Sequence, residues 1–223
     1  MSRTDISRIA EKGRTERAEL DTLLDATWLG HVALVREDGW PVVIPTAVVR
    51  DGDRLLLHGS TGSPWMRTVA GGAPVSVAVT AVDGVVVARS AFESSIHYRS
   101  AVLFGTCTRL EGADKERALD LLTDGLIPGR TGEVRPSTRR ELAATMVLAL
   151  PIAEWSLKVS DDFSEDPDSD VAGDAWAGVV PLAPQRHGAP LPHPDLRPGI
   201  EVPASVRALT GDAGRADGAT SGA

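Results

Sequence analysis

Short β-rich runs separated by Asp-Gly pairs constrain the fold of this chain more than any other feature. Two such pairs, at 38–39 and 51–52, separate three apolar runs at 28–36, 40–50 and 54–58. Glycine accepts the positive φ of a two-residue turn, so an Asp-Gly pair between apolar runs predicts a β-hairpin. The segment therefore predicts three strands in an antiparallel meander. Pro41 and Pro45 in the second run predict an edge, a bulge or a barrel corner.

The chain up to about residue 159 adds strands and short helices without regular alternation. Apolar residues recur at helical spacing near 14–26, 114–122 and 138–145. The last stretch opens with the capping-box pattern Thr138-x-x-Glu141. Further strands are expected at 74–82, 85–89, 97–110, 146–152 and 154–159. This order favours a mainly β fold with inserted helices, an antiparallel barrel of six or seven strands, over a doubly wound parallel sheet.

Composition divides the chain into four parts. Residues 1–13 are expected to form a flexible charged arm, and residues 14–159 the barrel domain. Seven carboxylates and no basic residue fall within 160–174, and six prolines within 181–198. We therefore expect residues 160–208 to form an acidic and proline-rich extension that packs on the barrel or on a partner subunit. Trp176 in this extension is expected to anchor it, with covering of a bound ligand as the alternative, and residues 209–223 are expected to be disordered.

Charge and cysteine content exclude several classes of protein. The 23 basic and 31 acidic side chains give a net charge of -8, which disfavours nonspecific binding to nucleic acid or to an anionic membrane. Apolar stretches fall well short of the about 18 residues of a membrane span, and the start lacks the apolar block of a signal peptide. Cys107 is the single cysteine, so no internal disulfide is expected. We expect a soluble cytoplasmic protein that acts on a small molecule.

Motifs of other site classes are incomplete. Asp166-x-Asp168-x-Asp170 begins like a calcium loop, but the glycine and the bidentate glutamate that such a loop requires are missing. His187 and His193 have no cluster of further ligands near them in the sequence, so no metal site is expected.

The segment 55–67 (LLLHGSTGSPWMR) has the strongest binding signal. A strand ends at His58, a loop of Gly, Ser and Thr follows, and Ser63-Pro64 predicts the start of a helix with Ser63 as its N-cap. Backbone N–H groups, the loop hydroxyls, the helix N-terminus and the charge of Arg67 together suit a phosphate group. An ordinary strand–loop–helix junction has the same pattern, so both interpretations stand at this point.

A second polar segment, 94–100 (SSIHYRS), enters a strand and holds the only tyrosine of the chain. Strand alternation places His97 and Arg99 on one face of the sheet and Tyr98 and Ser100 on the other. A strand at a binding site and an exposed strand with ordinary polar side chains both fit this pattern.

In their order, these segments resemble the flavin-binding split-barrel proteins related to pyridoxamine 5'-phosphate oxidase, and among them the nitroimidazole-resistance branch. The resemblance covers about residues 15–205 and rests on VALVREDGWPVVIPTAVV, LLLHGSTGSPWMR, PVSVAVTAVDGVVVARSAF, YRSAVLFG, WSLKV and WAGVVPL. It implies an FMN-binding split barrel and a homodimer with FMN at the subunit interface. The Arg-rich substrate pattern of true pyridoxamine 5'-phosphate oxidases is not recognisable, which argues against vitamin B6 oxidation.

The resemblance also implies roles for single residues. The phosphate end of FMN is assigned to Gly59, Ser60, Ser63 and Arg67. The backbone near Ile44, Pro45 and Thr46 is expected along the isoalloxazine ring. His58 is expected close to flavin and substrate as the catalytic residue, able to donate a proton. The strand facing the site is matched by Tyr98, Arg99 and Ser100, and Lys158 is a further candidate for the phosphate or substrate region.

The leading hypothesis is an FMN-dependent oxidoreductase that transfers a hydride to or from a small organic substrate. Three alternatives stay open on the sequence. The chain could be a flavin-binding module without turnover. It could be a haem protein on the same barrel, with His58, His97 or a histidine of the extension as axial ligand. A deazaflavin could also take the place of FMN.

Overall fold

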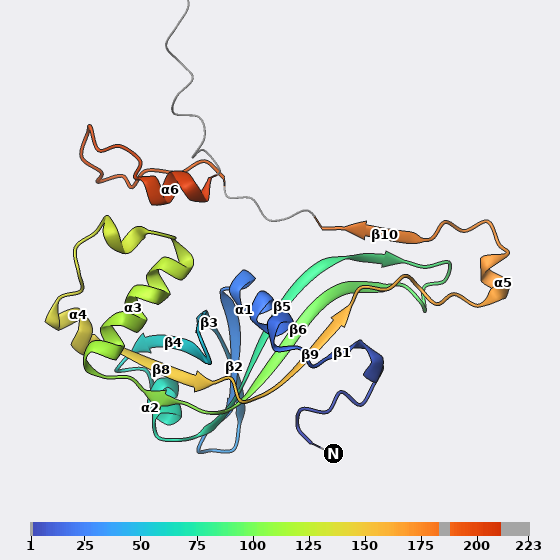
Figure 1. The fold of residues 1–223 in the computed structure, drawn as a ribbon, viewed down its shortest axis with the longest axis horizontal. Coiled ribbons are helices and arrows are strands. Elements are labelled where there is room, and N and C mark those ends of the chain that lie inside the picture. The colour runs from blue at the N-terminus through green and yellow to red at the C-terminus, as the bar shows by residue number, and fades with distance from the viewer. Residues whose placement is uncertain (1, 183–187, 211–223) are drawn as a thin grey trace, which may run out of the picture.

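The computed structural model describes residues 2–182 and 188–210 (Figure 1). Within these residues a ten-stranded sheet has the order β1-β9-β6-β5-β2-β3-β4-β8-β7, and β10 pairs with β5 off this path. The strands are β1 Gly13–Arg14, β2 Leu29–Val35, β3 Pro41–Asp51, β4 Arg54–Ser60, β5 Pro74–Val87, β6 Ser95–Thr106, β7 Thr108–Arg109, β8 Thr145–Pro151, β9 Glu154–Ser160 and β10 Gly178–Pro181. The helices are η1 Ala10–Lys12, α1 Arg17–Ala26, α2 Pro64–Ala70, α3 Gly112–Leu126, η2 Arg130–Gly132, α4 Arg139–Ala144, α5 Asp168–Val171 and α6 Ala204–Leu209.

The predicted mainly β fold, an antiparallel split barrel with inserted helices, is confirmed. Every strand pair is antiparallel, and the sheet coils without closing. The strands outnumber the expected six or seven because β1, β7 and β10 add short pairings at its margins. β1 belongs to the charged arm and pairs with β9, while β10 belongs to the extension and pairs with β5. No helix in the described part of the chain is long and apolar enough to cross a membrane.

The prediction of separate strands at 74–82 and 85–89 is wrong. β5 runs through both segments, and its register against β6 shifts between Val82 and Gly84, which leaves Asp83 in a β-bulge. The Arg99 guanidinium on β6 donates hydrogen bonds of 2.9 and 2.8 Å to the Asp83 carboxylate. A bulge accommodates the extra residue inside the ladder, so this Asp-Gly pair makes no turn.

Strands β3 and β4 separate halfway along their length, and this separation opens the barrel. β3 pairs with β2 from Pro41 to Ala47, whereas it pairs with β4 only from Val48 to Asp51. β4 continues along β8 to its last residue, Ser60. Within the described residues, the first half of β3 therefore has a strand partner on one side only. The sequence predicted an edge, a bulge or a barrel corner in this run, and the structure shows an edge.

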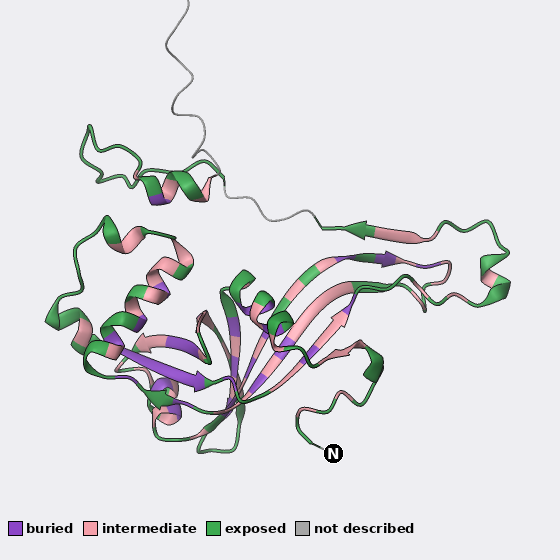
Figure 2. Ribbon diagram, in the orientation of Figure 1, coloured by how far each residue is buried: buried purple, intermediate pink, exposed green. Residues whose placement is uncertain are grey.

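Two apolar clusters lie on opposite faces of β4. Inside the barrel, α1 and α2 pack against the strands through Leu20, Leu23, Leu24, Met66 and Val69. Leu55 and Leu57 of β4 join this cluster, while Leu56 points the other way and packs with Val147 and with Ala118 and Leu122 of α3. Figure 2 shows buried segments along the central strands and on the helices that pack against them. The N-terminal arm and α5 are mostly exposed.

The polar contacts that join the extension to the barrel, besides β10, include one before α5 and one at α6. The Asp166 carboxylate accepts hydrogen bonds from the backbone N–H and the guanidinium of Arg89, at 3.0 and 2.9 Å. At α6, the backbone N–H and the hydroxyl of Ser205 both donate to the Glu133 carboxylate. Figure 1 shows α5 and β10 beside the far ends of β5 and β6, and α6 near the end of α3.

Both predicted helix starts are confirmed, but they differ in their caps. Thr138 and Glu141 form a complete capping box at α4, with the Thr138 Oγ1 accepting the Glu141 N–H at 3.3 Å. α2 begins at Pro64 after Ser63 as expected, yet the Ser63 side chain makes no capping hydrogen bond. The fixed φ of Pro64 is thus the feature that starts α2.

We expect Thr138→Ala to lower the free energy of unfolding by about 1 kcal/mol, because it removes a made N-cap bond. Ser63→Ala is the matched control and should leave the free energy of unfolding nearly unchanged. Urea unfolding followed by circular dichroism measures both. Equal losses in the two variants would contradict this difference between the caps.

Candidate functional site

An open groove of about 1180 Å³ lies at the split, between the free edge of β3 and helix α2. The β3 side contributes Val42, Val43 and Ile44, and the end of β2 with its turn adds residues 34–38. The α2 side contributes Trp65, Arg67 and Thr68. The groove exists because β3 leaves β4 at Val48 and the chain then places a helix, rather than a strand, beside the free edge.

The free edge of β3 carries main-chain groups that no strand satisfies. Alternate N–H and C=O groups of an edge strand point away from its single neighbour. Main-chain polar groups that lose contact with water need a hydrogen-bond partner. A flat ligand with its own donors and acceptors could therefore bind along Val42–Thr46 much as a further strand would.

Arg67 is the main source of positive charge in the groove. Its Nη1 donates to the Gly62 carbonyl at 2.9 Å, and no carboxylate lies within ion-pair distance among the described residues. The other arginine of the groove, Arg36, pairs with Asp38 at 3.2 Å. Arg67 is exposed. One guanidinium nitrogen is held by the loop before α2, and the rest of the guanidinium is available to an anion.

The loop of residues 59–63 uses most of its polar groups within the protein. A Cβ on Gly59 would lie 3.0 Å from Cγ of the buried Met66, so a larger residue fits poorly there. The Ser60 hydroxyl accepts the Gly62 N–H at 3.1 Å. Thr61 donates its N–H and its hydroxyl to the Ala144 carbonyl, at 2.9 and 3.2 Å. Within the described residues, the Ser63 hydroxyl is the one that this loop leaves without a hydrogen bond.

His58 lies on β4, directly after Leu57, the last residue of this strand that pairs with β3. It lies opposite Val147 of β8 and on the same face as Leu56, which places it at the border of the α3 cluster. The ring is half-buried, and its Nδ1 atom is buried without a hydrogen-bond partner. Burial lowers the pKa of the His58 imidazole from its ordinary value, which favours the neutral ring.

The structure brings only some of the predicted site residues together. Ile44 and Arg67 line the groove, and Pro45 and Thr46 continue along the same free edge. The loop residues Gly59, Ser60 and Ser63 directly precede α2 and do not line the groove themselves.

The residues predicted on the second polar segment lie elsewhere. Tyr98, Arg99 and Ser100 are on β6, which is three strands from β3, or about 14 Å at the usual strand spacing. Arg99 is engaged with Asp83 in the bulge. Lys158 on β9 donates to the Arg8 carbonyl at 3.1 Å and so holds the N-terminal arm. These side chains do not reach the groove of their own chain.

The sequence did not indicate Trp65 as a groove residue. Trp65 could have been found, because it follows Pro64 at the start of a helix whose Arg67 was already a candidate. His31 lies on β2, opposite Pro45 and Ala78, and does not line the groove.

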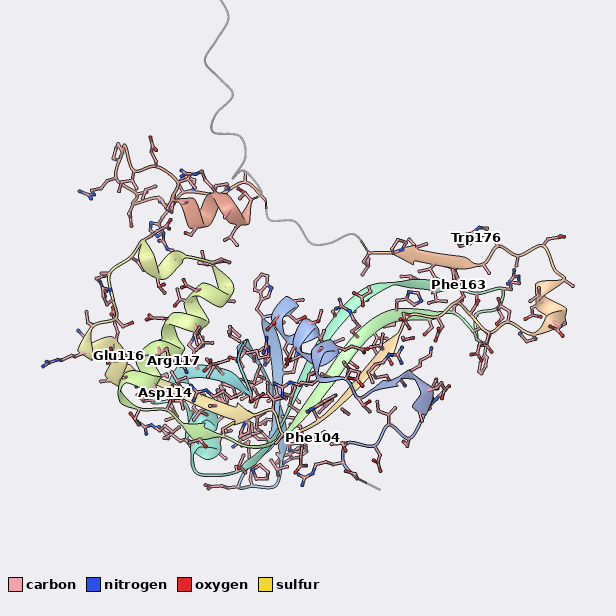
Figure 3. All side chains as sticks on the ribbon, viewed as in Figure 1. Phe104, Asp114, Glu116, Arg117, Phe163 and Trp176 are labelled. Carbon is pink, nitrogen blue, oxygen red and sulfur yellow. The ribbon has the colours of Figure 1, made fainter. Side chains whose placement is uncertain are left out.

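Neither Trp176 nor His193 is among the residues that line the groove. Figure 3 labels Trp176 beside β10 and Phe163 near the far end of β6, both distant from α2, and both side chains are exposed. His193 lies in the described part of the extension, whereas His187 lies outside the described residues. Over the part of the chain that the structure describes, no group of three or more His, Cys, Asp or Glu residues could hold a metal ion.

Comparisons with known proteins agree with this architecture. Residues 16–159 match the protein family described as pyridoxamine 5'-phosphate oxidase. No curated protein matches the chain in sequence.

The solved structures similar to this chain include the following three proteins. The FAD and heme binding protein from Mycobacterium smegmatis is 56% identical, with a TM-score of 0.86 over 89% of this chain and 97% of that chain. The flavocytochrome Anf3 from Azotobacter vinelandii is 33% identical, with a TM-score of 0.87 over 94% of this chain and 97% of that chain. A Bacteroides thetaiotaomicron protein described as a candidate 5-nitroimidazole antibiotic resistance protein shares the fold at 16% identity, with a TM-score of 0.56 over 66% of this chain and 86% of that chain. The matched family segment and the two closer structures together show that this chain belongs to the pyridoxamine 5'-phosphate oxidase family.

Proposed function

We propose that this protein is a flavin-binding redox protein that holds FAD in the groove at the split and carries a haem as a second cofactor. The groove is the observation that carries the proposal. It combines a free strand edge, an aromatic side chain and an arginine without a carboxylate partner among the described residues.

These three features fit the three chemical parts of a flavin nucleotide. The pyrimidine end of the isoalloxazine ring has N–H and carbonyl groups that match an unpaired strand edge. Val42, Ile44 and Trp65 supply apolar surface for the ring system. Arg67 supplies a positive charge for a phosphate group. The volume of about 1180 Å³ accommodates either a mononucleotide or a dinucleotide.

The sequence resemblance implied FMN, and the similar structures favour FAD. The Mycobacterium smegmatis protein is described as binding FAD and haem, and Anf3 is described as a flavocytochrome. Both align with nearly the whole chain, including much of the extension. We therefore extend both cofactors to this protein.

Bound flavin would supply hydride and electron transfer. The residues of the chain would hold the cofactor: Arg67 fixes its anionic end, while Trp65 and the β3 edge orient its ring and limit the access of water. Reaction with a small organic substrate at the open side of the groove is the activity that we propose. Storage or sensing without turnover would use the same residues and is separated from it by reduction and reoxidation of the bound flavin.

We also propose a homodimer. Ala33, Ala78 and Val102 lie on the face of β2, β5 and β6 that points away from the barrel interior, alternating with the buried residues of the core. No helix of the described chain covers this part of the face, which also carries Tyr98 and Ser100. A second copy on this face would bury these residues, as the family resemblance implies.

The first test is Arg67→Gln. Loss of a charge-assisted contact of about 1.5–3 kcal/mol predicts about ten- to hundredfold weaker binding of FAD and of FMN. Titration of the desalted protein with each flavin, followed by flavin fluorescence, gives both dissociation constants. Arg109→Gln is the matched control, because Arg109 is on β7 and already pairs with Glu111. Unchanged flavin affinity in Arg67→Gln would refute the role of the groove.

The second test is Ala78→Arg. A long charged side chain at the centre of the open sheet face should convert a dimer into a monomer, since an unpaired charge is costly to bury in an interface. Sedimentation velocity gives the mass, and circular dichroism checks that the variant is folded. A wild-type protein that sediments as a monomer would refute the proposed homodimer.

A further inference from the structure

We infer that His58 is an axial ligand of the haem. This inference rests on the proposed function, since it assigns one residue of the chain to a cofactor proposed there. Neither the fold nor the match to the family indicates which of the five histidines of the chain would bind iron. The surroundings of each histidine decide the question.

In the part of the chain that the structure describes, His58 has an unpaired ring nitrogen and lies beside an apolar cluster. Its Nδ1 is buried and makes no hydrogen bond, and no hydrogen bond to its other ring nitrogen occurs within the described residues. Buried polar atoms in native proteins are nearly always paired, so such an atom calls for an explanation. The other ring nitrogen, Nε2, which is also unpaired in the described structure, is not among these buried atoms. Ligation at Nε2 would hold the ring in this orientation, with Nδ1 turned into the protein.

The walls around His58 suit an apolar macrocycle. Val147 lies opposite on β8, and Leu56 precedes it on the same face. Both belong to the cluster that α3 covers, with Leu119 and Leu121 partly buried against it. On its other side, β4 has left β3, so no strand takes the space beside the ring in the described structure. The surroundings of the ring are therefore apolar on one side, and on the other side the sheet is open.

The charge state of His58 agrees with ligation. Iron binds the neutral imidazole, and a protonated ring must first lose its proton. Because burial lowers the pKa of His58, it favours the ligating, neutral form of the ring. The nearest charged group along β4 is Arg54 at the far end of the strand, and it is held by Asp51 and Asp114. Within the described residues, no carboxylate hydrogen bonds to His58 that would favour the charged ring.

Three of the other histidines fit the role less well. The Nε2 of His97 lies 3.0 Å from the Asp162 carbonyl, and the Nδ1 of His193 accepts the Asp195 N–H at 3.1 Å. The His97 ring is half-buried and the His193 ring is exposed. His31 lies between Pro45 and Ala78 on the sheet face that we assign to the second copy. His187 lies outside the described residues.

The position of His58 also places it near the groove. Only the loop of residues 59–63 separates it from Pro64, which lines the groove at the start of α2. A haem held by His58 and a flavin held by Arg67 would therefore bind at the two ends of one short loop. Electrons could pass between the two cofactors without crossing the barrel.

The experiment is a titration of wild type, His58→Ala, His31→Ala and His97→Ala with haemin, followed by the Soret absorbance. We expect His58→Ala to bind haemin at least about tenfold more weakly than wild type. We expect His31→Ala and His97→Ala to retain wild-type affinity. His97→Ala is the matched control for loss of a half-buried ring that already has a hydrogen-bond partner. A wild-type spectrum in His58→Ala, or a loss confined to His31→Ala, would overturn the inference.

A second variant separates ligation from a general effect on folding. His58→Gly leaves a space in which free imidazole can replace the missing ring, so added imidazole should restore the wild-type Soret spectrum. Failure of this rescue in a variant that unfolds at the wild-type temperature would also overturn the inference. Titration of each variant with FAD tests the proposed flavin site independently. A wild type that binds FAD but shows no haemin spectrum would refute both the haem and its ligand while leaving the flavin proposal intact.

Discussion

The divergence of β3 from β4 at Val48 is the constraint on which the rest of this molecule depends. A continuous pairing would close the barrel and satisfy every main-chain group of β3 within the sheet. The separation instead leaves the stretch from Pro41 to Ala47 with one neighbour and brings α2 to the other side. The separation of β3 from β4 creates the groove. Arg67 and His58 both lie beside the gap between these two strands, which is why one is exposed and the other only half-buried.

Charge distribution supports the same location. The three lysines of the chain are all used to hold structure: Lys12 donates to the Ser160 hydroxyl, Lys115 to the Leu142 carbonyl and Lys158 to the Arg8 carbonyl. Many arginines are paired with carboxylates, as in the network of Arg54 and Arg117 with Asp51 and Asp114. Figure 3 labels Asp114 and Arg117 on α3, and neither residue lines the groove. Arg67 differs from these because it faces an open groove and has only a main-chain carbonyl as its partner among the described residues.

Local signals in the sequence predicted the fold well. Asp38-Gly39 and Asp51-Gly52 give tight turns, in which Gly39 and Gly52 have φ of 82° and 60°. Asp83-Gly84 has the same letters but makes a bulge, because the Arg99 guanidinium on β6 binds Asp83 within the continuing ladder. That contact joins residues of two strands, so no local pattern could reveal it.

The candidate site was predictable only where it is local in sequence. The segment 58–67 and the proline-marked edge of β3 both carry signals, and the structure brings the helix start at 64–67 and this edge to one groove. The family resemblance added four further residues to the site: Tyr98, Arg99, Ser100 and Lys158. Strand order separates these four residues from the groove within one chain. Strand order is set by long-range pairing, which spacing along a chain does not reveal. Whether a second copy brings such residues to the groove depends on an interface that a single chain does not contain.

The measurement that tests the central claim most directly is the absorption spectrum of the protein as purified and desalted, followed by denaturation and chromatographic identification of the released cofactors. The account predicts flavin absorbance together with a Soret band, and release of FAD and haem. Protein that is colourless as purified and takes up neither flavin when it is added would contradict the assignment of the groove as a flavin site.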